Sequence, residues 1–217
     1  MPAAISAQSG DTALSGGSRK GHAWPRMVVY RLLGALEASG GGVRADLGPP
    51  KQRALLAVLL IRANEIVPVD VLLEELWGEE SPRRAQHAVQ VYVSDLRRAL
   101  APLGAGDAIT WRSPGYVLAA DPEAIDARRF ERLVAEGARR AADGESSAAA
   151  ILREALALWR GEPLADFTYD EFAQPAIRRL AAARYLAIET LASVELAQGR
   201  ATEALAGTAG RAPRLVV

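Results

Sequence analysis

Hydrophobic residues recur at helical spacing in two neighbouring segments of the chain, and each segment predicts a helix. The first, GPPKQRALLAVLLIRAN at residues 48–64, opens with prolines, which suit a first helical turn. The second covers residues 69–77 and stops before Gly78, a residue type that commonly ends helices. The leucines on the buried side of the first helix are expected to be Leu55, Leu56, Leu59 and Leu60.

A third helix is predicted in SPRRAQHAVQVYVSDLRRAL at residues 81–100, with Ser81 as its N-cap and Pro82 in its first turn. At about 100° per residue, one side is apolar and the other presents arginines and small polar groups. The apolar side consists of Ala85, Val89, Tyr92, Val93, Leu96 and Leu100. The opposite side holds Arg84, His87, Val91, Ser94 and Arg98, with Arg83 and Gln90 at its edge.

Short strands are predicted before and after these helices. MVVYRLLGAL at residues 27–36 predicts one strand, and a second is expected at residues 43–47 beyond a glycine-rich turn. ITWRSPGYVLAAD at residues 109–121 contains two runs of strand-forming residues around a turn at residues 113–115. Trp111 and Tyr116 are expected to anchor this hairpin to the core.

From Asp121 onward the pattern changes to long helices rich in alanine, leucine and arginine. The Asp121-Pro122 step is the expected domain boundary, and Asp126 is the expected cap of the first long helix. Small residues at helical spacing predict closely packed helix pairs of the tetratricopeptide type. The predicted helices cover residues 126–142, 146 or 147 to 159, and 175–197. Gly199 is expected to end the third, and Ala201 to begin another.

The order of elements predicts a mainly α fold with a small β component. Three helices, the third basic, followed by a hairpin, are typical of a winged helix-turn-helix domain. An all-α, tetratricopeptide-like domain follows it. The expected divisions are a disordered tail at 1–26, rich in Ala, Ser and Gly, a winged helix domain at 27–120 and a helical domain at 121–217.

Composition excludes several classes of function. The chain has no cysteine and only two histidines, His22 and His87, so no zinc site or thiol chemistry is predicted. Phosphate-binding glycine motifs, nucleophile elbows and metalloprotease motifs are all missing, which predicts neither an enzyme nor a cofactor. No apolar run approaches the roughly 18 to 20 residues of a membrane span, so a soluble, cytoplasmic protein is expected.

Charge is unevenly distributed although 26 basic residues balance 26 acidic ones. Residues 65–80 contain acidic side chains and no basic one, whereas residues 83–98 carry four arginines, His87 and a single Asp95. A basic helix of this kind is either a solvated arginine face or a nucleic-acid contact. The surrounding order of elements favours DNA, with Arg112 in the hairpin as a further contact.

Several separated motifs resemble one known family. LGPPKQRALLAVLLIRAN, LLEELWG, VQVYVSDLRRAL and GYVL are similar, in order and spacing, to the OmpR-type winged helix of the Streptomyces antibiotic regulatory protein family. DARRFERLVAEG, ALALWRGEPLADF and ELAQGRATEAL resemble the bacterial transcriptional activation domain that follows it there. The resemblance covers roughly residues 27–205.

The resemblance implies a transcriptional activator of pathway-specific genes, commonly for antibiotic biosynthesis. Such a protein binds direct repeats in the major groove of double-stranded DNA as a side-by-side homodimer in the nucleoid, and it recruits RNA polymerase. The DNA-facing residues implied are Arg83, Arg84, His87, Gln90, Val91, Ser94, Arg97, Arg98 and Arg112. The turn implied to face polymerase consists of Gly78, Glu79, Glu80 and Ser81.

Two departures from the family pattern leave an alternative open. The chain stops where further activation-domain helices usually follow, and it has no nucleotide-binding ATPase module. The sequence therefore also allows a truncated antagonist that occupies DNA without activating, or a protein-interaction module. In addition, Met27 is a possible translation start.

Overall fold

Three short antiparallel strands open the part of the chain that the structure, a computed structural model, describes, which is residues 28–198. The strands pair in the order β1-β2-β3, with Tyr30 opposite Ala38. The single strand predicted at residues 27–36 is wrong, because the chain turns at Gly34, whose φ of +147° suits glycine. The strands are β1 (Val29–Arg31), β2 (Glu37–Gly40) and β3 (Val43–Arg44). The tail predicted at 1–26 lies outside the described residues.

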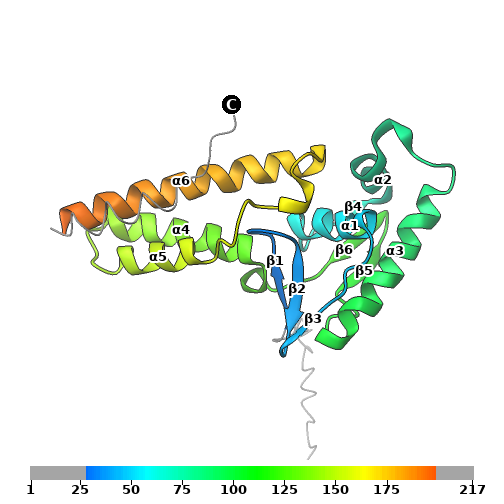
Figure 1. The fold of residues 1–217 in the computed structure, drawn as a ribbon, viewed down its shortest axis with the longest axis horizontal. Coiled ribbons are helices and arrows are strands. Elements are labelled where there is room, and N and C mark those ends of the chain that lie inside the picture. Colours follow the sequence, from blue (N-terminus) through cyan, green and yellow to red (C-terminus); the bar gives the residue numbers. More distant parts are fainter. Residues whose placement is uncertain (1–27, 199–217) are drawn as a thin grey trace, which may run out of the picture.

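Three helices follow and pack around a leucine-rich core (Figure 1). The first two helices are confirmed, and Leu55, Leu59 and Leu72 in them are completely buried. The apolar side of the third is also confirmed, since Val89, Leu96 and their neighbours at helical spacing are buried. The helices are α1 (Pro50–Ile61), α2 (Val69–Trp77) and α3 (Ala85–Leu100).

The start of α3 differs from the prediction. Ser81 is not the N-cap, because the helix begins at Ala85 and Arg84 occupies the cap position. The amide of Ala85 donates instead to the carbonyl of Pro82 at 2.9 Å, which closes a separate turn before the helix. Arg83 and Arg84 therefore lie at the entrance of the helix, where both are exposed.

The predicted hairpin forms the second sheet together with a short strand that precedes α2. Its strand order is β4-β6-β5, and Trp111 lies opposite Tyr116. Gly115 belongs to a strand and not to the turn as predicted, and a β-carbon there would lie 1.8 Å from the carbonyl oxygen of Val67. Only glycine allows these two strands to approach so closely. The strands are β4 (Val67–Pro68), β5 (Ile109–Arg112) and β6 (Gly115–Leu118).

Three helices form the elongated half of the molecule (Figure 1). The first two pack closely because Gly137 has no side chain: a β-carbon there would lie 2.6 Å from Leu152 Cγ. The third helix runs along both. They are α4 (Asp126–Ala142), α5 (Ala148–Ala157) and α6 (Gln174–Ala197), close to the predicted ranges, whereas Gly199 and Ala201 lie outside the described residues.

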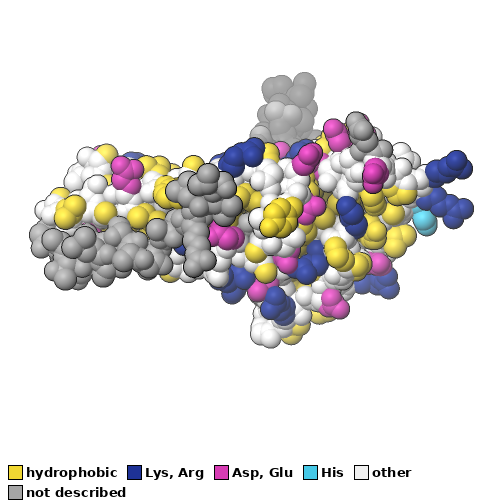
Figure 2. All heavy atoms as spheres, turned by 45° about the horizontal axis from the view of Figure 1, so that its top comes forward, with side chains coloured by type: hydrophobic (Ala, Val, Ile, Leu, Met, Phe, Trp, Pro, Cys, Tyr) yellow, Lys and Arg dark blue, Asp and Glu magenta, His cyan; other side chains and the backbone are white. Residues whose placement is uncertain are grey.

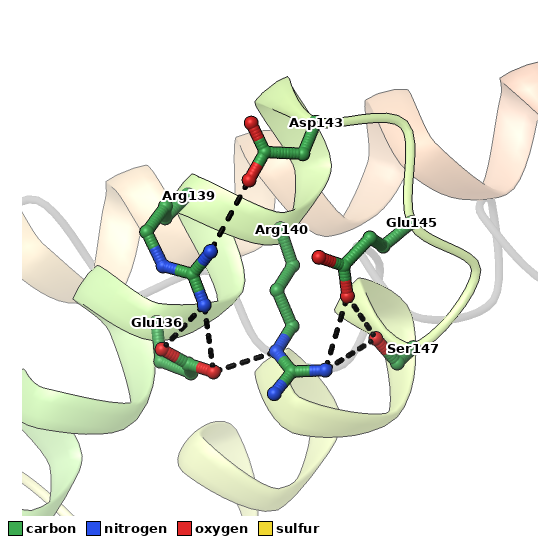
Figure 3. A network of polar contacts seen from close by, with 6 residues as sticks. All are labelled: Glu136, Arg139, Arg140, Asp143, Glu145 and Ser147. Atoms are coloured by element: carbon green, nitrogen blue, oxygen red, sulfur yellow. Dashed lines mark hydrogen bonds and ion pairs between the residues drawn. The ribbon is translucent and has the colours of Figure 1, made fainter.

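A polar network holds the turn between α4 and α5 (Figure 3). Arg140 donates to Glu136 at 2.6 Å and to Glu145 at 3.0 Å, and Arg139 bonds Glu136 and Asp143. Hydrogen bonds from the two arginines hold the pKa of Glu136 below its usual value. Because these groups are largely exposed, the network orders the turn more than it stabilises the fold.

The carboxylate of Asp126 joins the first sheet to the helical half. Asp126 is not the predicted cap of α4: its side chain is only 7% exposed and accepts the amide N–H groups of Leu32 at 2.6 Å and Leu33 at 3.2 Å. Burial raises its pKa above the usual value for aspartate, an effect that outweighs the two hydrogen bonds. Next to it, the amide groups of Arg160 and Leu164 donate to the carbonyl groups of Leu33 and Leu32.

Replacing Asp126 by alanine is expected to lower the free energy of unfolding by about 2 kcal/mol or more, because two buried amides lose their acceptor. Urea unfolding followed by circular dichroism measures the change. Asp107→Ala is the matched control, since Asp107 is exposed and engages no partner among the described residues. Equal stability of the two variants would show that Asp126 does not carry this junction.

Candidate nucleic-acid interface

The exposed side of α3 is a continuous row of basic and small polar side chains. Five residues spaced three and four apart lie along it, and the edge residues Arg83 and Gln90 are exposed beside them. Basic side chains and a histidine project from the end of the molecule at which α3 lies (Figures 1 and 2). The five residues of the row are Arg84, His87, Val91, Ser94 and Arg98, all of them exposed.

The single acidic residue of this surface does not neutralise it. Asp95 pairs with Arg98 one turn along the helix, and the side chain of Arg98 remains 78% exposed. An exposed ion pair of this kind contributes little, so Arg98 can exchange Asp95 for another anion at low cost. The row thus presents its arginines to solvent on a helix whose other side is fixed in the core.

Arg97 differs from the other predicted contacts. It is half-buried, and its Nε donates to the carbonyl oxygen of Ile109 in β5 at 2.9 Å. This bond ties the C-terminal half of α3 to the hairpin. Arg97 therefore positions the hairpin against the helix, while Arg98 beside it stays available at the surface.

The hairpin places Arg112 at its tip, where the side chain is exposed. The prediction that Trp111 anchors the hairpin to the core is wrong, because Trp111 is 53% exposed and meets Tyr116 edge-on, with ring centroids 5.2 Å apart. Tyr116 is buried, as predicted, and anchors the hairpin together with Ile109 and Leu118, which are also buried. The core ends before Trp111, so the indole ring of Trp111 lies partly in solvent, next to Arg112 in the sequence.

The turn between α2 and α3 is a short 3-10 helix, Gly78–Glu80. Gly78, Glu80 and Ser81 are exposed there. Gly78 has a positive φ of 57°, which ends α2 and turns the chain toward α3. This turn precedes the N-terminal end of α3, whereas the hydrogen bond from Arg97 to the hairpin lies near the C-terminal end.

Sequence reasoning missed two features of this surface. These features are the exposure of Trp111 and the hydrogen bond from Arg97 to Ile109. Both depend on where the core ends, which a local sequence pattern does not indicate. Within residues 28–198 no group of His, Asp or Glu side chains is placed to hold a metal ion. The helices in that range are all too short or too polar to cross a bilayer.

Two protein-family models match the two halves of the chain. The description "Transcriptional regulatory protein, C terminal" matches residues 46–118, and "Bacterial transcriptional activator domain" matches residues 125–212. The first match covers α1 to α3 and the hairpin. The second begins immediately before Asp126 and includes α4 to α6.

Several transcriptional regulatory proteins are similar to this chain in sequence. The transcriptional regulatory protein MoaR1 of Mycobacterium tuberculosis is 36% identical over 80% of this chain and 57% of its own length. The regulatory protein DnrI of Streptomyces peucetius is 34% identical over 80% of this chain and 66% of its own length. The chain thus spans only part of the length of these relatives.

The fold is similar to that of Mycobacterium tuberculosis EmbR, solved in complex with a low-affinity phosphopeptide. The TM-score is 0.79 at 35% identity, over 83% of this chain and 48% of EmbR. This likeness confirms the predicted fold class, a winged helix followed by a helical domain.

Replacing Arg97 by alanine is expected to lower the free energy of unfolding by about 1–2 kcal/mol, because the carbonyl of Ile109 loses a charged donor. Arg98→Ala, one position along the same helix, should change it by less than about 0.5 kcal/mol. Urea denaturation of both variants tests the assignment. Equal losses would mean that the bond between α3 and the hairpin contributes no stability.

Proposed function

Because the chain belongs to the Streptomyces antibiotic regulatory protein family of transcriptional regulators, we propose that it is a sequence-specific DNA-binding transcriptional activator. The observation that carries the proposal is the exposed basic row on α3 beside an arginine-tipped hairpin. The family consists of regulators and not of enzymes.

In this proposal α3 enters the major groove. The row from Arg84 to Arg98 spans 14 helical steps, or about 21 Å at 1.5 Å per residue, enough to follow several base pairs. Its opposite side is fixed in the core by Val89, Val93 and Leu96, so the exposed side chains approach DNA from a rigid support.

The side chains of α3 suit both parts of DNA recognition. Arg83, Arg84 and Arg98 can bond phosphate oxygens or guanine edges, and Gln90 can pair with an adenine edge. Val91, 41% exposed although apolar, can contact a thymine methyl group. His87 and Ser94 supply shorter polar contacts between them.

Arg112 in the hairpin reaches the DNA backbone or the minor groove. Its contribution is to affinity more than to sequence choice, because phosphate contacts position a protein and base contacts specify the site. Arg97 assists indirectly, since it fixes the hairpin relative to α3.

We infer binding to direct repeats as a homodimer, recruitment of RNA polymerase through the turn Gly78–Ser81, and control of a secondary-metabolite pathway in the cytoplasm. DnrI and the Streptomyces coelicolor regulator RedD, 34% identical over 82% of this chain, support a regulatory role.

Arg98→Ala and Arg112→Ala are each expected to weaken binding to DNA from upstream of the protein's own reading frame, and to reduce the slope of log affinity against log salt by about 0.9. Gln90→Ala should instead change base preference and keep the slope. Gel shifts at several salt concentrations, with scrambled competitor DNA, measure both quantities.

Arg178→Ala is the control for these variants, because Arg178 is an exposed cation on α6, in the other half of the molecule. It should leave affinity and slope nearly unchanged. A wild-type chain that forms no salt-sensitive, sequence-preferring complex would refute DNA recognition. A change of base preference in Arg112→Ala with an unchanged slope would refute the phosphate role of the hairpin.

Activation is tested separately from occupancy. The full chain is expected to raise transcription from a reporter promoter that carries its binding site. The comparison is Arg98→Ala, the variant that is expected to bind DNA more weakly. A chain that binds the site and lowers transcription would be an antagonist, which is the alternative that the sequence left open.

A further inference from the structure

A groove separates α2 from the segment that leads into α6. Its volume is about 1000 Å³, and α1, α2 and the residues just before α6 form its walls. A smaller hollow of about 400 Å³ continues it, since both are lined by Arg62, Glu75, Glu171 and Phe172. The two family models match residues on opposite walls, so the groove exists only where the two halves of the chain meet.

Aromatic rings line this groove. Trp77, half-buried, stacks on Tyr92 with ring centroids 6.3 Å apart, and Phe172 packs on Phe167 at 5.4 Å. Tyr169 is 97% exposed at the rim, on the wall opposite Trp77. A tyrosine held so fully in solvent beside a groove provides a free ring face for a partner.

The charges of the groove are predominantly negative. The two cations of the larger part are already engaged, because Lys51 donates to the carbonyl of Leu76 and Arg62 pairs with Glu75. The two further arginines of the smaller hollow are engaged as well, Arg128 with the carbonyl of Ile61 and Arg179 with Glu131. Glu74 on one wall and Asp170 and Glu171 on the other are exposed. In the part of the chain that the structure describes, these three carboxylates form no hydrogen bond or ion pair.

We propose that this groove binds a basic segment of a partner protein. Carboxylates on both walls match guanidinium or ammonium groups, and the ring of Tyr169 can accept a cation on its face. The segment would bridge the winged helix and the activator domain, so that each half supplies one wall of a single binding site. The inference rests on the proposed function in that the transcription machinery would provide this segment.

Charge explains why a protein segment suits the groove better than nucleic acid. Unpaired carboxylates repel phosphates, so DNA bound at α3 is excluded from this surface. Acidic side chains are visible around the upper part of the same half of the molecule, away from the basic end (Figure 2). DNA and the basic segment can therefore be held at the same time.

The test uses the full chain and a short amidated helical peptide of arginine and alanine, with a glutamate and alanine peptide as the acidic control. Isothermal titration calorimetry measures the affinity. The triple variant E74Q/D170N/E171Q is expected to lose about tenfold or more, since each exposed charge pair contributes roughly 0.5 kcal/mol. Tyr169→Ala should lose several-fold without any change of charge.

A matched triple variant, D107N/E162Q/E189Q, removes three exposed carboxylates elsewhere and should lose less than about twofold. Equal losses in the two triple variants, or no binding of the basic peptide to the wild-type chain, would overturn the proposal. So would a groove variant that changes the oligomeric state in sedimentation, because the occupant would then be a second copy.

DNA binding serves as the independent readout. The groove variant should keep wild-type gel shifts and unfolding midpoint, since all three substituted side chains are exposed. Failure of the wild-type chain to bind DNA would refute the proposed function and leave the peptide result intact. Loss of DNA binding in the groove variant alone would overturn the separation of the two surfaces.

Discussion

The buried carboxylate of Asp126 is the constraint on which the arrangement of the two halves depends. Leu32 and Leu33 turn their amides inward where β1 ends, and without an acceptor both would be buried and unsatisfied. Asp126 supplies that acceptor at the first residue of α4, so the start of the helical half is fixed to the first sheet. Further bonds follow from this placement: Asp166 accepts the amide of Leu36 at 2.6 Å and pairs with Arg53 of α1 at 2.7 Å.

Local patterns sufficed to predict most helices and the side of α3 that packs. The spacing of hydrophobic residues indicates which side of a helix is buried. Val89 and Leu96 could therefore be assigned to the core without knowledge of the residues they contact. The same reasoning located the exposed row that ends at Arg98. Glycine and proline marked the end of α2 and the start of α1, because their backbone preferences are local.

Features decided by distant contacts could not be predicted in this way. An aspartate before a helix is typically its cap, yet Asp126 bonds amides 93 and 94 residues away, which no window of sequence contains. Trp111 has the pattern of a core residue, but the core ends before it reaches the tip of the hairpin. Arg97 and Arg98 are adjacent residues of the same type, but only Arg97 lies where its side chain can donate to the carbonyl of Ile109.

The acidic and basic segments of residues 65–98 lie on different surfaces of the folded protein. A chain without net charge gains little long-range attraction to DNA, so the proposed DNA binding would depend on arginines placed together and carboxylates placed elsewhere. Glu74 and Glu75 of α2 line the groove shared with Asp170 and Glu171. Arg98 of α3, and Arg83 and Arg84 just before this helix, are exposed on the other surface. Because α2 and α3 pack on the same core, the basic and the acidic surfaces are held apart, and in the proposed function this separation would favour a single orientation of the protein on DNA.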